Sequence, residues 1–281
     1  CCRNGTVRKL YEHRSDEWCG HCLQRLMGSS VISLGLGLGG GKASTSSGGL
    51  PGGSFVNEYS LDFDGTDEYL SIGDTSAIDS ATVLSFSMWC KIDSVSGNGY
   101  LFASGNSSTN GIWLIPYSDG NMYFVARNTA SGYIYIANPS TGSWHHILTV
   151  FNGASPKIYV DGSLVSHTTG PGGINVTLSA TGGDDFNIGG KWGTSAADNF
   201  NGKIDEFAYW ASDQSSNIAT IYNGGVPADL DDLDPAGWWR MGEDATWGGT
   251  NWTIPDASDN DNAGTTQNMD EDDRVTDVPS A

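Results

Sequence analysis

Residues 82–92 read TVLSFSMWCKI, and this stretch decides the class of fold. Every second residue is apolar, which gives one face made of Leu84, Phe86, Met88, Cys90 and Ile92. The positions between them include the polar residues Ser85, Ser87 and Lys91. Successive side chains of a β-strand point to opposite faces, so a repeat of two residues is typical of a strand with one buried face. We therefore expect a half-buried β-strand here.

The chain on both sides of this stretch repeats the pattern. Short runs rich in β-branched and aromatic residues, separated by Gly, Asn and Asp, occur at residues 111–117, 121–127, 132–138, 144–151, 157–162, 174–180, 186–190 and 203–210. Such runs predict an all-β protein, an antiparallel β-sandwich. Asp161–Gly162 is a pair that two-residue hairpin turns favour. One short helix is expected at residues 215–225, with Gly224 at its end.

Composition and charge limit the classes of function. The 281 residues include 39 Gly, 10 Trp, 11 Tyr and 9 Phe, which is too aromatic for a disordered chain. The net charge is −20, but residues 1–42 hold six of the 13 Lys and Arg against three acids, so the rest of the chain carries about −23. A body this acidic repels nucleic acid, so we expect no nucleic acid partner.

The sequence allows several origins for the N-terminal residue Cys1, and they differ in whether the protein is attached to a membrane. No run of 18 or more apolar residues occurs, so a membrane-spanning helix is not expected. Cys1 can follow removal of an initiator Met, proteolytic maturation, or cleavage ahead of a lipid-modified cysteine. Only the last of these routes would anchor the protein to a membrane.

The sequence divides into four parts. Residues 1–28 are basic and hold four of the five cysteines, and residues 29–56 are rich in Gly and Ser, as an extended arm would be. Residues 57–228 contain the alternating runs of the sandwich. Residues 229–281 are acidic and rich in turn residues, and we expect this C-terminal extension to pack on the sandwich.

Three segments resemble a known family. Trp144–Gly162 is similar to the central hairpin of laminin G-like jelly rolls in the concanavalin A-like lectin and glucanase superfamily. Tyr59–Ile72 resembles the first strand pair of that fold, and Phe186–Trp210 resembles its closing strands. The resemblance implies a concanavalin A-like jelly roll, a fold that is found in lectins, hydrolases, adhesion domains and structural modules.

The cysteine-rich N-terminal segment is a candidate zinc site. Trp18–Cys22 reads WCGHC, the active-site motif of protein disulfide isomerases, but no strand can precede it and no thioredoxin pattern follows. Two cysteines at this spacing can bind one zinc ion, and Cys2, His13, Cys19 and Cys22 would complete a tetrahedral set. Zinc would also stabilise a segment too short to form a core. Free thiols or disulfides are the alternative.

Two acidic clusters are candidate calcium sites, because calcium prefers carboxylate and carbonyl oxygens. The first combines Asp62, Asp64 and Asp67 with Asp205, which the resemblance places on a neighbouring strand.

The second cluster approximates a calcium-binding loop that starts at residue 259. Its ligands would be Asp259, Asp261 and Asp270, although Ala263 occupies a usual ligand position. For both clusters the alternative is a solvated acidic turn.

The sequence argues against catalysis. Glucanases of this fold carry carboxylates at alternate positions of one strand, so that both face the catalytic cleft. Here only Asp205 and Glu206 share a strand, and because they are adjacent we expect them to point to opposite faces. His145 and His146 lie in a strand of the hairpin without a nucleophile motif, so we interpret them as packing residues. Non-enzymatic binding is expected instead.

Large aromatic residues in turn regions can stack on sugars. Trp113, Tyr117, Trp192 and Trp247 are candidates for such carbohydrate binding, with core packing as the alternative for each.

The C-terminal residues favour one biological setting. GWWRMGE at 237–243 and DASDNDNAGTTQNMD at 256–270 resemble the continuation of such domains in bacteriophage and marine bacterial proteins. This resemblance implies a virion surface protein, for decoration or as a fibre, held to other virion proteins or to copies of itself through residues 1–56 and presenting its sandwich to host-surface glycans. The alternative is a secreted or lipid-anchored bacterial carbohydrate-binding protein, extracellular or on the cell surface.

Overall fold

The chain divides into two units, Cys1–Gly53 and Ser54–Ala281. The computed structural model describes only residues of the second unit: 55–73, 78, 81–107, 110–128, 132–153, 155–172, 174, 178, 185–191 and 198–281. The predicted anchor at 1–28, most of the arm at 29–56 and Trp192 lie outside the described residues. The same holds for the zinc ligands Cys2, His13, Cys19 and Cys22.

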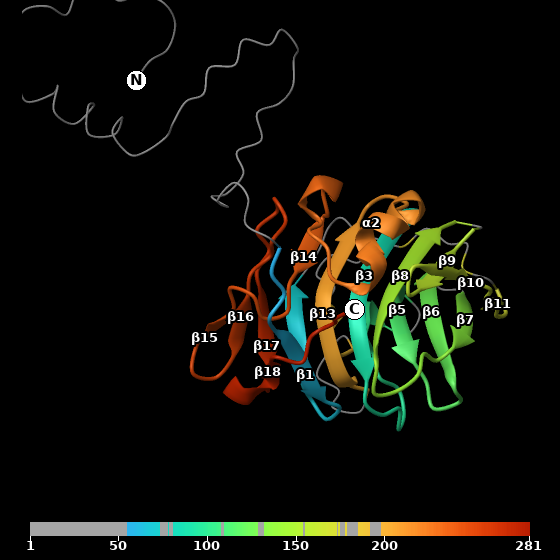
Figure 1. Cartoon of the computed structure of the whole chain (residues 1–281). Helices are drawn as coiled ribbons and strands as arrows, with labels where there is room; N and C mark the ends of the chain where they lie inside the picture. The colour runs from blue at the N-terminus through green and yellow to red at the C-terminus, as the bar shows by residue number, and fades with distance from the viewer. Residues whose placement is uncertain are drawn as a thin grey trace, which may run out of the picture. The chain divides into compact units, whose positions relative to one another are not determined.

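The described residues form two antiparallel sheets, which Figure 1 shows as the layers of a sandwich. The first, sheet A, contains in spatial order β10 (Ser163–Val165), β9 (Lys157–Val160), β8 (Trp144–Asn152), β3 (Val83–Ile92), β13 (Asn201–Trp210), β1 (Ser60–Asp64) and β18 (Arg274–Val275). A further strand, β14 (Gly237–Trp239), also pairs with β13. The predicted all-β, antiparallel sandwich is confirmed.

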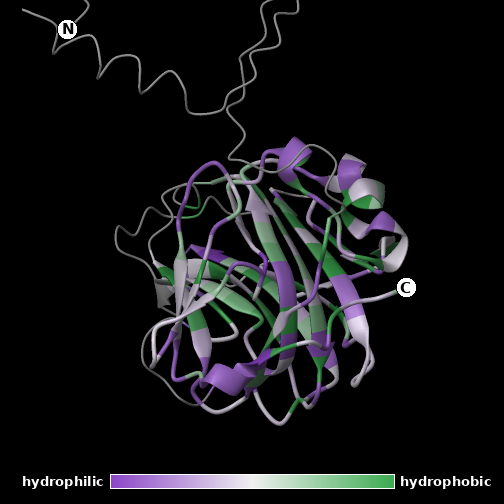
Figure 2. Cartoon of the chain, turned by 60° about the vertical axis from the view of Figure 1, so that its left-hand side comes forward, coloured by the Kyte–Doolittle hydropathy of each residue, from purple (hydrophilic) through white to green (hydrophobic). Residues whose placement is uncertain are grey.

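The second layer, sheet B, is the larger. It contains in spatial order β11 (Thr168–Thr169), β7 (Tyr133–Ala137), β6 (Asn121–Asn128), β5 (Asn110–Pro116), β4 (Phe102–Ser107), β12 (Asp185–Ile188), β2 (Tyr69–Gly73), β17 (Gly264–Gln267), β16 (Trp252–Ile254) and β15 (Thr246–Trp247). Figure 2 shows that hydrophobic residues concentrate on the strands.

The core lies between the sheets, and β3 provides its centre. All five residues of the predicted apolar face, Leu84, Phe86, Met88, Cys90 and Ile92, are 0% exposed and belong to this core. The ring of Phe86 stacks on that of Phe102 from sheet B, with their centroids 4.4 Å apart. The apolar face of the first quoted stretch is therefore confirmed.

The expectation that β3 is buried on one face only is wrong. Ser85, Ser87 and Trp89 on its second face are also buried. The hydroxyl of Ser85 donates a hydrogen bond of 2.7 Å to the backbone oxygen of Ser212, and Trp89 stacks on Tyr222. A layer of chain after β13 thus covers the outer face of sheet A, and small hydrogen-bonded serines allow it to approach closely.

This covering layer contains the short helix that the sequence predicts. Residues Ser215–Asn217 form a 3₁₀ turn, and α2 (Ile218–Tyr222) follows it near β3 and β8 (Figure 1). Asn223 ends α2 with φ at 48°, a left-handed conformation that Asn tolerates, so the stop comes one residue before Gly224. Short 3₁₀ turns follow at Asn223–Gly225 and Asp231–Leu233.

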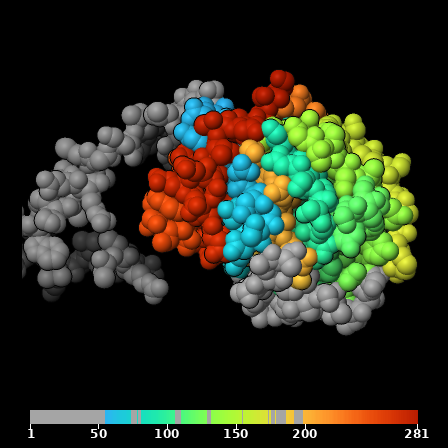
Figure 3. Space-filling view, turned by 90° about the horizontal axis from the view of Figure 1, so that it is seen from below, coloured from blue at the N-terminus to red at the C-terminus, as the bar shows by residue number. Residues whose placement is uncertain are grey.

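The C-terminal extension contributes to both sheets. β15, β16 and β17 lengthen sheet B beside β2, and β18 pairs with β1 in sheet A, after a 3₁₀ turn at Glu271–Asp273. Figure 3 shows this extension packed beside the first strands. The last described residues cross sheet A, where Asp277 accepts hydrogen bonds from Lys91 Nζ at 2.7 Å and Trp144 Nε1 at 3.0 Å.

The turn predicted between β9 and β10 is also present. Asp161 and Gly162 have φ values of 49° and 75°, as a two-residue turn with two left-handed positions requires. In the part of the chain that the structure describes, no helix is long and apolar enough to span a membrane.

Candidate functional site

The outer face of sheet B carries a pocket lined mainly by aromatic side chains. In β5, Ile112 and Leu114 face the core, whereas alternation turns Trp113 and Ile115 to the opposite side. The pocket has a volume of about 280 Å³, and we call it the aromatic pocket. It is lined by Asn98, Tyr100, Trp113, Ile115, Tyr117, Tyr123, Val125, Arg127 and Tyr133.

The rings of the aromatic pocket support one another. The ring of Tyr123 lies edge-to-face with those of Tyr117 and Tyr133, at centroid distances of 6.1 and 5.5 Å. The guanidinium of Arg127 lies 5.2 Å from the centre of the Trp113 ring. Trp113 is only 5% exposed and forms the floor, whereas Tyr117 is 40% exposed at the rim. The rings therefore hold one another in place and form an apolar surface that is accessible to solvent at Tyr117.

Polar groups surround these rings. The Tyr123 hydroxyl donates a hydrogen bond of 2.5 Å to Asp119, which raises the pKa of Tyr123 to about 12 and lowers the pKa of Asp119. Burial, with a smaller contribution from Asp198, raises the pKa of Tyr100 to about 12. Asn98 Nδ2 donates to Asp198 at 2.7 Å. The lining of the pocket thus contains phenols and an amide, and the carboxyl groups of Asp119 and Asp198 are hydrogen-bonded to it from outside.

Of the four predicted sugar-binding residues, the structure brings Trp113 and Tyr117 together in this pocket. Trp247 lies on β15, where its ring packs 5.3 Å from that of Trp252, and it is not part of the pocket lining. Sequence reasoning missed Tyr123 and Tyr133. The run NMYFVAR held a signal, because its odd positions alternate with residues of the core.

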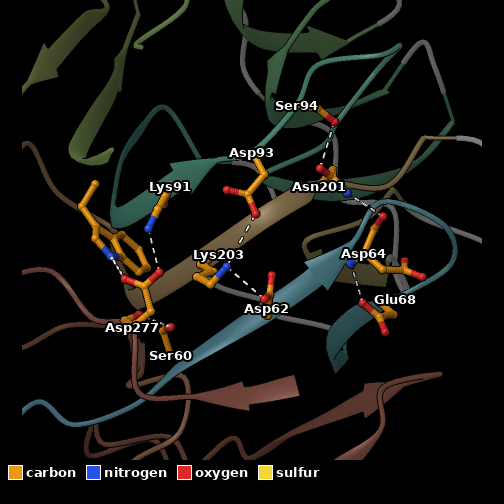
Figure 4. Close-up of polar contacts among 11 residues, drawn as sticks. Ser60, Asp62, Asp64, Glu68, Lys91, Asp93, Ser94, Asn201, Lys203 and Asp277 are labelled. Atoms are coloured by element: carbon orange, nitrogen blue, oxygen red, sulfur yellow. Dashed lines mark hydrogen bonds and ion pairs between the residues drawn. The ribbon is translucent and has the colours of Figure 1, made fainter. Parts of the chain in front are cut away.

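The first predicted calcium cluster is divided in the structure. Figure 4 shows Asp62 directed at Lys203, with 2.9 Å between Oδ2 and Nζ, while Asp64 donates its backbone N–H to Glu68. Asp205 does not join Asp62, Asp64 and Asp67 as a metal-ligand group in the described ranges. It lies beside Asn57, whose Nδ2 donates to Asp205 Oδ2 at 2.8 Å. Calcium binding by the three remaining residues stays a prediction.

The second predicted cluster does not form the compact loop that its spacing suggests. Residues 264–267 are the strand β17, and an extended strand carries Asp270 away from Asp259 and Asp261. Within the described part of the chain these three acids do not form a metal-ligand group. Asp270 instead precedes the 3₁₀ turn Glu271–Asp273, where it forms a capping box.

The expectation that Asp205 and Glu206 point to opposite faces is wrong. The pairing of β13 with β3 shifts register between Asp205 and Ala208, and Glu206 has φ at 48°, so a β-bulge interrupts the alternation. Both carboxyl groups are buried, and their ligand atoms lie within 4.8 Å of each other and of Glu243. They lie outside the lining of the aromatic pocket.

Burial governs the acidity of this pair. It raises the pKa of Asp205 and raises that of Glu206 to about 7. Two hydrogen bonds limit this rise in the pKa of Glu206. Arg240 Nε donates to Oε1 of Glu206 at 3.0 Å, and Trp238 Nε1 donates to Oε2 at 2.6 Å.

His146 is a packing residue, as expected. It is 0% exposed, its Nε2 lies 2.9 Å from the hydroxyl of the buried Ser87, and Trp89 and Tyr222 pack against its ring. Burial lowers the pKa of His146 to about 3. A ring that is buried away from solvent cannot contact a substrate, so His146 is not a catalytic residue of this fold. The neighbouring His145 pairs with Asp161 in the hairpin turn, at 2.8 Å.

Comparison with solved structures agrees with this fold. A putative carbohydrate-binding protein from Bacteroides ovatus is 17% identical with a TM-score of 0.55, and the match covers 80% of this chain and 62% of that protein. A pentraxin from Limulus polyphemus is 18% identical with a TM-score of 0.43, covering 59% of this chain and 82% of that one. Domains LG4-5 of the mouse laminin alpha1 chain are 16% identical with a TM-score of 0.41, covering 55% and 41%.

Comparison with curated protein sequences gives no match. A family model described as the concanavalin A-like lectin/glucanases superfamily matches residues 64–217, more than half of the chain. These residues include the central hairpin and most of the other segments that carry the resemblance in the sequence, which is thereby confirmed. The chain belongs to the concanavalin A-like lectin/glucanases superfamily.

Proposed function

We propose that this protein binds carbohydrate without cleaving it, and that the aromatic pocket is its binding site. The observation that carries the proposal is the joining of Trp113, Tyr117, Tyr123 and Tyr133 in one pocket on the outer face of a rigid sheet. Sugar rings have apolar C–H faces that pack on aromatic rings, and hydroxyl rims that need hydrogen-bonding partners. The Bacteroides ovatus protein, described as a putative carbohydrate-binding protein, has a similar fold.

The polar groups at the pocket fit the hydroxyl groups of a sugar. Tyr100 and Tyr123 keep their protons at neutral pH because their pKa values are raised to about 12. The Tyr123 hydroxyl donates its proton to Asp119, so towards a sugar its oxygen can act as an acceptor. Asp119 and Asp198 are hydrogen-bonded to the lining residues Tyr123 and Asn98, and each carboxylate oxygen has a second lone pair that can accept from a hydroxyl. The pocket can therefore fix the orientation of a ring that stacks on Tyr117.

The same groups argue against hydrolysis. A glycosidase needs a carboxylic acid that holds its proton near neutral pH and a second carboxylate opposite it. The pKa of Asp119 is lowered by its bond from Tyr123, so it cannot be that acid. Among the described residues, the carboxyl groups whose pKa is raised are not part of the pocket lining; they are Glu68, Asp205, Glu206, Asp231 and Asp273.

Affinity measurements on pocket variants test the proposal. A glycan array identifies a ligand, and calorimetry then compares the wild type with Tyr117→Ala. We expect about tenfold weaker binding, or about 1.4 kcal/mol, because one stacking face is lost. Leu164→Ala is the matched control, since Leu164 is an exposed apolar residue on β10 of the other sheet.

Two results would contradict the proposal. Equal affinity in the wild type and Tyr117→Ala would place the sugar elsewhere. Release of reducing sugar from the bound glycan would show that the protein is an enzyme.

For the biological setting, we propose the surface of a virion, with a secreted or lipid-anchored bacterial protein as the alternative. The C-terminal resemblance supports the first, and a carbohydrate-binding sandwich suits both. Labelled antibodies on purified particles and mass measurement of the N-terminus test the choice. Particles that carry the protein support the first setting, and a lipid-modified Cys1 supports the second.

A further inference from the structure

Three buried oxygen atoms without a hydrogen-bond donor lie where distant parts of the chain meet. Asp205 on β13 is 0% exposed, and its Oδ1 has no partner. The same holds for two other buried atoms, Oδ1 of Asn57 ahead of β1 and Oε2 of Glu243 in the C-terminal extension. Asn57 is hydrogen-bonded to Asp205, and ligand oxygens of Asp205, Glu206 and Glu243 lie within 4.8 Å of one another.

The surrounding contacts hold these side chains and leave one buried oxygen of each without a donor. Asp205 Oδ2 accepts from Asn57 Nδ2 at 2.8 Å. Glu243 Oε1 accepts from the backbone N–H groups of Glu58 and Tyr59, at 2.6 and 2.9 Å. In Asp205 and Glu243 these bonds occupy Oδ2 and Oε1, so Oδ1 and Oε2 remain without a donor; we call these two atoms and Oδ1 of Asn57 the orphan oxygens. The orphan oxygens are therefore preorganised acceptors that lack a positive partner.

The charges show what kind of partner is missing. Asp205, Glu206 and Glu243 bring three carboxylates together, and the contact of Arg240 with Glu206 compensates one of them. Both oxygens of Glu206 are already used by Arg240 and Trp238. Buried carboxylates without compensation cost several kcal/mol each. A divalent cation would balance the remaining two charges.

We propose that Asp205, Glu243 and Asn57 bind one calcium ion through these three oxygens, next to the Glu206–Arg240 pair. The ligand set contains only oxygen atoms, which favours a hard cation over zinc or copper. Calcium accepts six to eight oxygens in irregular geometry, so backbone carbonyls and water can complete the set, whereas magnesium demands a regular octahedron.

The ion would clamp three segments together. Asn57 precedes β1, Asp205 lies at the bulge of β13, and Glu243 belongs to the extension, so the ligands are far apart in the sequence. Asn57 and Glu243 lie outside residues 64–217, the part that matches the family model. Two of the three ligands therefore come from outside the part of the chain that the family shares, and an ion bound to them would connect the C-terminal extension to β13.

Thermal unfolding and calorimetry of the full chain test the site. After treatment with a chelator, added calcium should bind at one site per chain and raise the Tm by several degrees, while magnesium alone should give a much smaller rise. Asp205→Asn and Glu243→Gln nearly keep the side-chain shapes and should weaken calcium binding at least tenfold. Asp232→Asn and Glu271→Gln replace exposed acids that belong to no candidate calcium site, and these controls should respond like the wild type.

A second measurement does not depend on stability. Terbium replaces calcium at oxygen sites and emits when a nearby tryptophan is excited, and Trp238 is hydrogen-bonded to Glu206 beside the site. Terbium emission from the wild type should be displaced by calcium and be lost in Asp205→Asn. A wild type that neither binds calcium nor sensitises terbium would overturn the proposal, and would indicate that a proton on Asp205 replaces the cation. Equal responses in all four variants, or an equal response to magnesium, would also overturn it.

Discussion

Acidification should weaken the fold through one residue, His146. The ring is 0% exposed between β3 and the covering layer, and burial lowers its pKa from 6.5 to about 3. Below pH 6.5 His146 binds a proton in the unfolded chain but stays neutral in the folded chain. The free energy of unfolding therefore decreases as the pH falls towards 3. The substitution His146→Gln removes this proton while retaining a hydrogen-bonding group for Ser87.

The size of the effect follows from the two pKa values. At about pH 5 the unfolded state gains about 2 kcal/mol from protonation of this one ring. The figure hardly depends on the folded pKa, because any value below about 4 leaves the folded ring neutral at that pH. Between about pH 8 and pH 5 the wild type should therefore lose about 2 kcal/mol more stability than His146→Gln.

Urea unfolding followed by tryptophan fluorescence at both pH values measures this difference. Other titrating groups, including Asp205 and Glu206, contribute equally to both chains and cancel. His167→Gln, which removes a histidine between β10 and β11, is the matched control and should behave like the wild type. Equal losses in the wild type and His146→Gln would refute the reasoning. If the variant does not fold, an NMR titration of the His146 ring decides, and a ring that protonates near pH 6.5 would be the contrary result.

Two further predictions concern stability. Gly202→Ala should cost at least about 2 kcal/mol in urea unfolding, because φ is +139° and a Cβ would lie 2.1 Å from the backbone oxygen of Lys91. Gly97→Ala, where a Cβ meets nothing within 4 Å, should change stability by less than about 0.5 kcal/mol, and a comparable loss in both would count against the steric argument. Burial and the neighbouring Asp273 raise the pKa of Glu68 from 4.5 to about 8, so the folded state holds this proton more tightly and stability falls as the pH rises through that range. Glu68→Gln should lose less stability than the wild type between about pH 6 and pH 9, and parallel profiles would contradict this.

The sequence by itself determined the class of fold, most of the central strands and one hairpin turn. The repeat of two residues in 82–92 identified the core side of β3, and Asp161–Gly162 identified the turn of a hairpin, because alternation and positive φ are properties of neighbouring residues. Trp113 and Tyr117 were selected from one short run as large aromatics of a turn region, although Trp113 lies within β5 and is only 5% exposed. Their partner Tyr133, however, comes from a different strand and joins them only through the pairing of β5, β6 and β7.

The tertiary structure decided where the carboxylates meet. Alternation placed Asp205 and Glu206 on opposite faces, but the register of β13 against β3 inserts a bulge that gathers them. Glu243 and Asn57 reach the same place only when the extension and the first segment close over the sheet. Alternation is a local property that a single strand carries with it. Register, bulges and the meeting of distant segments depend on the free energy of the whole packed sandwich, so they appear only when the chain has folded.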